Sequence, residues 1–144
     1  MDLEHDAIAT EQLLVECNAL RVTESYRRVH FTSLRDDAIA RWRASGHHDT
    51  TSQHFVEHRV ARGERALAEV LELEVHSDVA YAMCCTDLAE RARLSAKDQK
   101  KTLADVADVA SRAVREEMRY RTTLLGTLQY EVNELTMFID DHAG

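Results

Sequence analysis

The chain has 144 residues, a length that suits one domain able to bury its own core. It contains no proline and only four glycines, while 44% of its residues are hydrophobic and 31% are charged, which excludes a turn-rich fold and global disorder. Its net charge of −8 disfavours nucleic acid as the main partner, because a phosphate-binding surface needs clustered Lys and Arg.

The first predicted helix covers about residues 2–44. Apolar side chains recur along it in steps of four and three, the spacing that keeps one helix face against a partner helix. The predicted buried face comprises Ile8, Gln12, Val15, Ala19, Val22, Tyr26 and Val29, and then drifts to Phe31, Leu34, Ala38 and Trp42. A second apolar set, Leu13, Leu14, Cys17 and Leu20, widens this face as expected for a helix with two neighbours. Gly46 should end the helix by accepting the left-handed conformation.

The second predicted helix covers about residues 52–94. Asp49, Thr50, Thr51 and Ser52 all favour a helix start, so the start is well marked although its register is not. The predicted buried face comprises Val56, Val60, Gly63, Leu67, Val70, Glu74, Ser77, Tyr81, Cys84 and Leu88. Polar residues interrupt this face at Glu74 and Ser77, and Ser77-Asp78 is also compatible with a break and a new helix start.

The third predicted helix covers about residues 97–141. Its buried face reads Ala104, Ala107, Ser111, Val114, Met118, Arg121, Leu125, Leu128, Val132, Leu135 and Ile139. Ser95 followed by Asp98 resembles a capping box and predicts a tight turn before this helix. The alternative is one unbroken helix from residue 52 to 141, because nothing in residues 91–101 forbids helix.

These patterns predict an all-α fold: an elongated three-helix, up-down-up bundle, or antiparallel coiled coil, formed by residues 1–144 as a single domain. The charge distribution agrees with this order. Residues 1–20 hold five acids and no base, residues 21–43 hold six bases against three acids, and residues 49–90 hold nine acids against three bases. Residues 91–121 are net basic and the remaining residues are acidic, so every neighbouring pair in an up-down-up bundle is complementary.

Two opposite charges interrupt the predicted buried faces, namely Glu74 and Arg121. If the chain reverses near residue 97, residues that face each other on the second and third helices have numbers that sum to about 195, as these two do. A lone charge is costly to desolvate, so the sequence predicts a Glu74–Arg121 pair that fixes the register. The alternative is that both side chains extend to solvent.

The segment His54-Phe-Val-Glu57-His58 is the sharpest candidate for chemistry. A helix places both histidines on one face beside the acid, and the pattern resembles the H-x-x-E-H motif of inverted zincin zinc hydrolases. Those enzymes need a third protein ligand, and the sequence does not indicate one. Di-iron bundles need Glu-x-x-His on two helices, and this chain has none. We therefore predict no catalytic residue and no cofactor, with His54, Glu57 and His58 as candidates for a metal-binding alternative.

The three cysteines do not form a disulfide framework, because Cys84 and Cys85 are adjacent and Cys17 has no metal-ligand spacing to them. Core packing is the expected role of Cys84 and Cys85. The acidic N-terminus lacks the features of a signal peptide, and no apolar run reaches the length of a membrane span. The expected location is the cytoplasm.

The function that these features favour is a non-enzymatic interaction or assembly subunit that binds a protein partner, or a second copy, through long helical faces. The expected interaction seam is Met118, Leu125, Leu128, Val132, Leu135 and Ile139. The third helix also carries a second apolar stripe, Leu103, Val106, Ala110, Ala113, Tyr120 and Leu124.

An alternative function follows from the arginines between Arg112 and Arg121, which resemble the last helix of membrane-binding BAR domains. That resemblance implies a membrane-surface module that uses the basic segment 91–121.

Overall fold

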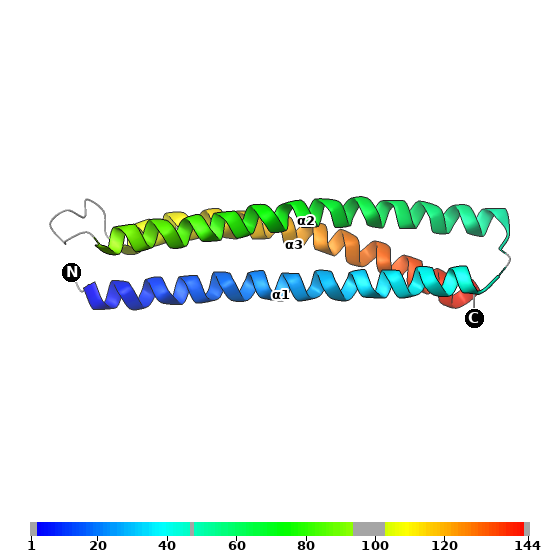
Figure 1. Ribbon diagram of the computed structural model, residues 1–144, viewed down its shortest axis with the longest axis horizontal. Helices are drawn as coiled ribbons and strands as arrows, with labels where there is room; N and C mark the ends of the chain where they lie inside the picture. Colours follow the sequence, from blue (N-terminus) through cyan, green and yellow to red (C-terminus); the bar gives the residue numbers. More distant parts are fainter. Residues whose placement is uncertain (1–2, 47, 94–102, 143–144) are drawn as a thin grey trace. The chain divides into compact units, whose positions relative to one another are not determined.

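The computed structural model describes residues 3–46, 48–93 and 103–142, with side chains from Glu11 onward except 91–92, 103–107 and 110. Three helices pack against each other: α1 (Leu3–Ala44), α2 (Thr50–Arg93) and α3 (Leu103–His142) (Figure 1). No described residue forms a strand. The predicted all-α fold is confirmed.

The helix α2 runs without a break through Ser77, so the possible restart at Ser77-Asp78 is wrong. The buried Ser77 hydroxyl donates a hydrogen bond to the Glu74 carbonyl oxygen at 3.0 Å. This bond to its own helix satisfies the serine without a change in backbone direction.

The connection between α1 and α2 follows from local chemistry. Gly46 has a φ of 97°, which favours glycine, and the Ser45 amide donates to the Arg41 carbonyl at 3.1 Å. Among the four candidate caps, Asp49 is used: its Oδ1 accepts from the Ser52 amide at 2.7 Å and its Oδ2 from the Ser52 hydroxyl at 2.9 Å. Hydrogen bonds from Ser52 lower the pKa of Asp49, because they stabilise the carboxylate.

Packing contacts divide the chain into two compact units, each built from a segment of all three helices. Unit 1 is Met1–Thr23 with Leu73–Tyr120, and unit 2 is Glu24–Glu72 with Arg121–Gly144. Each unit has its own apolar core.

The helix order is visible in unit 2. Arg35 of α1 reaches Glu64 of α2 at 3.1 Å, and Trp42 reaches Gln53 at 3.1 Å, so later α1 residues meet earlier α2 residues and these helices are antiparallel. The helices α1 and α3 are parallel, because Arg27 contacts Gln129 and the later residue Arg41 contacts the later residue Asp140. The up-down-up topology is therefore confirmed.

Residues 94–102, between α2 and α3, lie outside the described part, and so does the predicted turn at Ser95–Asp98. In unit 2, however, Arg59 of α2 lies 3.0 Å from Glu131 of α3. One unbroken helix from 52 to 141 cannot bring these residues side by side, and that alternative is wrong.

The apolar cores use the predicted faces of α2 and α3. In unit 1 the core comprises Cys17, Cys84, Leu88, Val114 and Met118. In unit 2 it comprises Ala38, Trp42, Val56, Ala66, Val70, Leu125, Leu128, Val132, Leu135 and Ile139. Every described position of the predicted α3 face from Ser111 to Ile139 is buried.

The prediction for α1 is wrong for the main apolar face between residues 15 and 29. Val15, Ala19, Val22, Tyr26 and Val29 were expected to be buried, and all five are exposed. The second predicted set and the later positions are confirmed in part: Cys17, Ala38 and Trp42 are buried, with Leu13, Leu14 and Phe31 packed beside them, whereas Leu20 and Leu34 are exposed. The buried residues that the sequence did not indicate on α1 are Glu24 and Arg35.

The charged side chains on the buried face of α1 are tolerated there because ion pairs compensate their charges. Arg21 lies 2.8 Å from Asp78 within unit 1, whereas Glu24 lies 3.0 Å from Arg27 within unit 2. Arg35 meets Glu64, and it approaches α2 where Gly63 has no side chain; a Cβ at Gly63 would lie 3.4 Å from Arg35 Nε.

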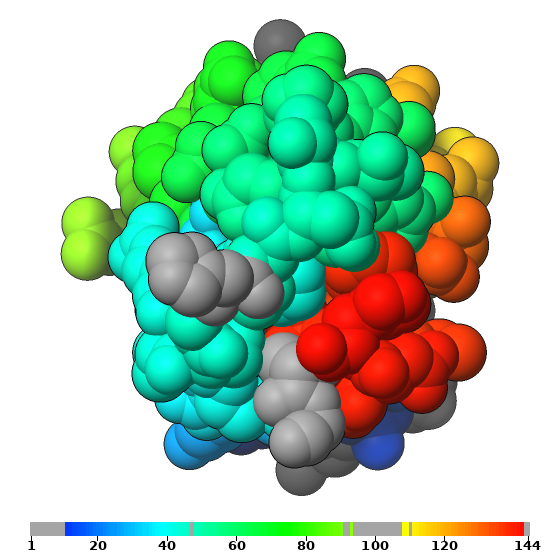
Figure 2. Space-filling model, turned by 90° about the vertical axis from the view of Figure 1, so that its right-hand side faces the viewer, coloured from blue at the N-terminus to red at the C-terminus, as the bar shows by residue number. Residues whose placement is uncertain are grey.

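Aromatic residues close the end of unit 2 that contains the α1–α2 connection, which Figure 2 views directly. His48 stacks on Trp42 with ring centroids 3.4 Å apart, and its Nε2 lies 2.9 Å from the Trp42 carbonyl oxygen. Phe138 of α3 stacks on Phe55 of α2 at 4.3 Å. These contacts tie the end of α3 to the start of α2.

Candidate interaction surface

An apolar stripe on the outer face of α1 is the feature that the fold leaves without an internal role. We call it the outer stripe and define it as Val15, Ala19, Val22, Tyr26 and Val29. These residues follow one another in steps of four and three along one unbroken helix. The exposed fractions are 62% for Val15, 46% for Val22, 74% for Tyr26 and 50% for Val29.

The outer stripe lies on the side of α1 opposite the core. Cys17 and Glu24, which are buried, are each two residues from stripe positions, and a step of two turns a helix by about 200°. The helix α1 therefore presents two faces with coiled-coil spacing, one to its own bundle and one to solvent.

Exposed apolar residues on the other two helices are arranged differently. On α2, Leu71, Val75, Val79 and Met83 follow in steps of four, and each step moves about 40° around the helix. On α3, Val109, Tyr120, Tyr130 and Met137 are exposed but separated by polar side chains. The outer stripe, by contrast, follows strictly alternating steps of four and three over five exposed apolar positions.

The seam expected to bind a partner is used inside the chain instead. Met118 belongs to the core of unit 1, and Leu125, Leu128, Val132, Leu135 and Ile139 belong to the core of unit 2. Their predicted burial is confirmed. Because they already pack against α1 and α2, they are not accessible to a partner while the bundle is folded. The second α3 stripe is divided: Ala113 and Tyr120 are exposed, and Leu124 packs against the core of unit 2.

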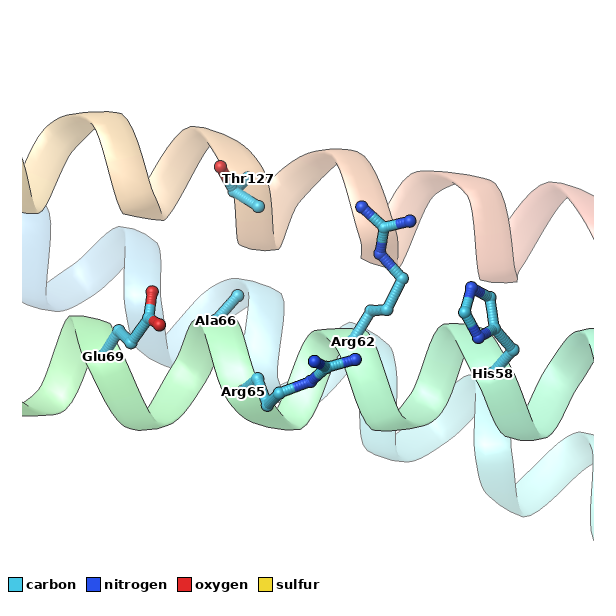
Figure 3. Close-up of a pocket in the computed structure, with 6 residues that line it drawn as sticks. All are labelled: His58, Arg62, Arg65, Ala66, Glu69 and Thr127. Atoms are coloured by element: carbon cyan, nitrogen blue, oxygen red, sulfur yellow. The ribbon is translucent and has the colours of Figure 1, made fainter.

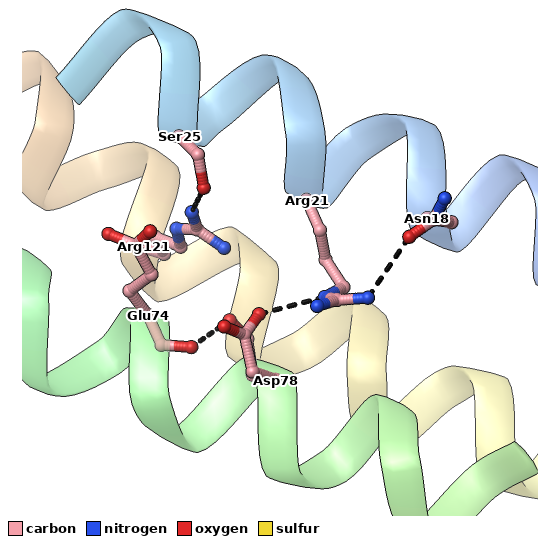
Figure 4. Close-up of polar contacts among 7 residues, drawn as sticks. Asn18, Arg21, Ser25, Glu74, Asp78 and Arg121 are labelled. Atoms are coloured by element: carbon pink, nitrogen blue, oxygen red, sulfur yellow. Dashed lines mark hydrogen bonds and ion pairs between the residues drawn. The ribbon is translucent and has the colours of Figure 1, made fainter. Parts of the chain in front are cut away.

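Arg121 lies at a buried position, as the α3 pattern predicted, and its side chain does not extend to solvent. Its Nη2 donates a hydrogen bond to Ser25 Oγ of α1 at 2.8 Å within unit 2 (Figure 4). Glu74 belongs to unit 1 and Arg121 to unit 2. The Glu74–Arg121 pair remains a prediction, and Ser25 is a partner that the sequence did not indicate.

The sequence analysis also did not predict that an acidic residue of α3, Glu131, is buried. Glu131 is nearly inaccessible and lies 3.0 Å from Arg59 Nη1 and 3.1 Å from Arg62 Nε, both on α2. The hydrogen bond with Glu131 raises the pKa of Arg59, since the ionised pair is stabilised. The sequence did contain a hint of this burial, because Glu131 is next to Val132, a residue of the predicted buried face of α3.

The candidate metal ligands His54, Glu57 and His58 are exposed on α2, and Glu57 accepts a hydrogen bond from the Gln53 side chain at 3.0 Å. Within the described ranges, no three His, Cys, Asp or Glu side chains are arranged to hold a metal ion. Among the residues that the structure describes, no third ligand accompanies this motif.

His58 also lines a shallow groove between α2 and α3 in unit 2, together with Arg62, Arg65, Ala66, Glu69 and Thr127 (Figure 3). The groove contains charges of both signs, and Arg62 already binds Glu131. It therefore lacks the concentration of one charge that would select an ionic ligand.

The arginines of the segment that resembles a BAR helix are partly neutralised in the fold. Arg112 pairs with Asp108, Arg115 lies 3.7 Å from Glu16, and Arg121 is buried. The segment consequently offers less free positive charge to a lipid surface than its sequence suggests. No helix in the described part is long and apolar enough to cross a membrane.

The cysteines have the expected environment of core residues. Cys17 and Cys84 are buried in the unit 1 core, and all three cysteines are free thiols. Burial raises the pKa of Cys17, and it raises the pKa of Cys84 to about 11. Both changes disfavour the reactive thiolate.

These features make the outer stripe the strongest candidate for a functional surface. Comparisons of this chain with known protein families, with curated proteins and with solved structures find no match.

Proposed function

We propose that this protein is a non-enzymatic interaction or assembly subunit that binds a helical partner through the outer stripe of α1. The observation that supports the proposal most directly is the exposure of Val15, Val22, Tyr26 and Val29 at coiled-coil spacing. A surface stripe of this kind is suited to the seam of a two-helix contact, because alternating steps of three and four keep it against a partner.

The energetics favour occupation of this face. Fully burying a Val or Leu side chain is worth about 1.5–3 kcal/mol, and these residues are near half exposed, so each contributes roughly 1 kcal/mol on binding. Tyr26 adds a large aromatic surface with a polar hydroxyl, a residue type enriched among those that dominate binding energy. Polar side chains border the stripe, including Asn18, Thr23 and His30, as expected for the rim of an interface.

A site-specific crosslink tests this proposal. A photoreactive phenylalanine analogue at Tyr26 should form adducts in cells that express the protein, and Val22→Lys in the same chain should abolish them. The matched control is the same analogue at Tyr120, another tyrosine that is more than half exposed but lies on α3. Equal labelling from the two positions, or none from Tyr26, would contradict a role for the outer stripe in binding.

A further inference from the structure

We propose that Cys17 of α1 and Cys85 of α2 form a redox-sensitive thiol pair, which hydrogen peroxide converts into a disulfide that links the two helices within unit 1. Cys17 lies on the buried side of α1, so this pair does not depend on binding through the outer stripe. Three kinds of observation support it: the register of the two helices, the groups around the thiols, and the different exposure of the three cysteines.

The register of α1 and α2 places Cys17 opposite Cys85. The guanidinium carbon of Arg21 lies 4.4 Å from the centre of the Tyr81 ring, and the earlier residue Cys17 packs with the later residue Cys84 in the core of unit 1. The two helices are therefore antiparallel within this unit. One turn back along α1 from Arg21 is Cys17, and one turn forward along α2 from Tyr81 is Cys85. These two thiols are the next facing pair after Arg21 and Tyr81.

The spacing of packed helices suits a disulfide at facing positions. Helix axes in contact are roughly 8–10 Å apart, and each Cα lies about 2.3 Å from its own axis. Facing Cα atoms are then roughly 3.5–5.5 Å apart when they point straight at each other, and farther apart when they are offset, whereas a disulfide needs about 4.4–6.8 Å. A bond between facing positions of α1 and α2 is thus compatible with the packed helices.

The electrostatic surroundings also indicate that these thiols are neighbours. Burial raises the pKa of Cys17, the charge of Arg115 and its hydrogen bond lower it, and negative charge on Cys85 raises it. Burial raises the pKa of Tyr81 as well, and a hydrogen bond with the Cys85 side chain adds to this change. Because charge interactions and hydrogen bonds weaken with distance, Cys17, Cys85, Tyr81 and Arg115 form one cluster.

The three cysteines differ in their exposure, and this difference assigns their roles. Cys17 and Cys84 are buried, whereas Cys85 is partly exposed. An oxidant in solution therefore reaches Cys85 first. Cys84 is a poor partner for Cys85, because the thiols of adjacent residues rarely meet the geometry of a disulfide. Cys17, on the facing helix, is the thiol that completes the bond.

The oxidation takes two steps. The Cys85 sulfur attacks one oxygen of hydrogen peroxide, the O–O bond breaks, and the thiol proton leaves with the other oxygen as water, so that Cys85 becomes a sulfenic acid. The Cys17 sulfur then attacks the Cys85 sulfur, the S–S bond forms, and the S–O bond breaks to release a second water that carries the Cys17 proton. One peroxide is reduced to two waters while two thiols lose two electrons. Arg115 favours the thiolate of Cys17 that the second step needs.

The intact mass of the full chain after treatment with hydrogen peroxide tests the pair. The monomer should lose the mass of two hydrogen atoms, and dithiothreitol should restore it. Cys17→Ala and Cys85→Ser should each abolish this loss, whereas Cys84→Ala is the matched control at the adjacent position and should keep it. Circular dichroism verifies that each variant is folded. A loss of mass that persists in Cys85→Ser, or that disappears in Cys84→Ala, would overturn the proposal.

Unfolding separates the geometry of the fold from the general reactivity of cysteines. In urea, Cys84 and Cys85 are equally free to reach Cys17, so the Cys84→Ala and Cys85→Ser variants should form the intramolecular disulfide at similar rates. In the folded chain, Cys84→Ala should form it about tenfold faster or more, because the fold positions Cys85 beside Cys17. Equal rates in the folded variants, or a folded chain that forms no intramolecular disulfide, would overturn the pair.

Discussion

Arg121 of α3 is fully buried and donates a hydrogen bond from Nη2 to Ser25 Oγ of α1, with 2.8 Å between the two atoms. A buried guanidinium is tolerated only where its donors find acceptors and its charge is compensated. The hydroxyl of Ser25 is thus part of what allows an arginine to occupy a position where the neighbouring turns of α3 carry Met118 and Leu125.

Replacing Ser25 with Ala should therefore destabilise the bundle by roughly 1–3 kcal/mol, because it removes the hydrogen bond that the Ser25 hydroxyl accepts from the charged Arg121 side chain. The matched control is Ser33→Ala, an exposed serine on the same helix, which should change the free energy of unfolding by about 0.5 kcal/mol or less. Urea denaturation of both variants measures the difference. Equal effects would show that the Arg121 contact contributes nothing.

The predicted Glu74–Arg121 pair is testable by a double-mutant cycle. If the two side chains form a pair, Glu74→Gln or Arg121→Met alone should destabilise more than the two changes together, because each single change leaves an uncompensated charge. The coupling free energy should exceed about 0.5 kcal/mol. Additive effects, measured as free energies of unfolding, would reject the pair.

Leu128 is fully buried in the core of unit 2, so Leu128→Ala should cost on the order of 2–5 kcal/mol from lost burial and a residual cavity. Met137→Ala is the matched control on α3, because Met137 is mostly exposed, and its effect should be below about 1 kcal/mol. A small effect at Leu128, seen in the thermal or urea midpoint, would mean that α3 is packed differently in solution.

Stability should fall at alkaline pH because of the buried thiols. The pKa of Cys84 is raised from 9.0 to about 11, so the unfolded chain ionises this group at a lower pH than the folded chain does. Its contribution to stability is therefore complete below about pH 9 and is lost as pH rises toward about 11.

A urea-midpoint series across this pH range measures the alkaline loss. Cys84→Ala should make the fall of the urea midpoint with pH less steep without abolishing it, because burial also raises the pKa values of Cys17 and Tyr81. Thiolate ultraviolet absorbance gives an independent reading of the ionisation. If the urea midpoint falls equally steeply with pH in the two proteins, Cys84 does not contribute to the alkaline loss of stability.

The sequence by itself determined the helices, their approximate ends and the buried face of α3. Absence of proline, a strong cap at residues 49–52 and a glycine at 46 are local signals, and local signals decide where helices begin and end. The α3 face was readable because its apolar positions alternate in steps of three and four with few competitors, and Arg121 was identified as its exception.

Only the tertiary structure decided which of the two apolar sets in the first half of α1 is buried. Periodicity favoured Val15, Val22, Tyr26 and Val29 because they are apolar, yet the bundle buries the face that carries Glu24 and Arg35. Burial of that face depends on compensating groups supplied by tertiary contacts, such as Glu64 beside Arg35. A hydrophobic pattern within one helix carries no information about a charge partner on another helix. The apolar positions that were predicted to be buried are therefore the ones that the fold leaves exposed.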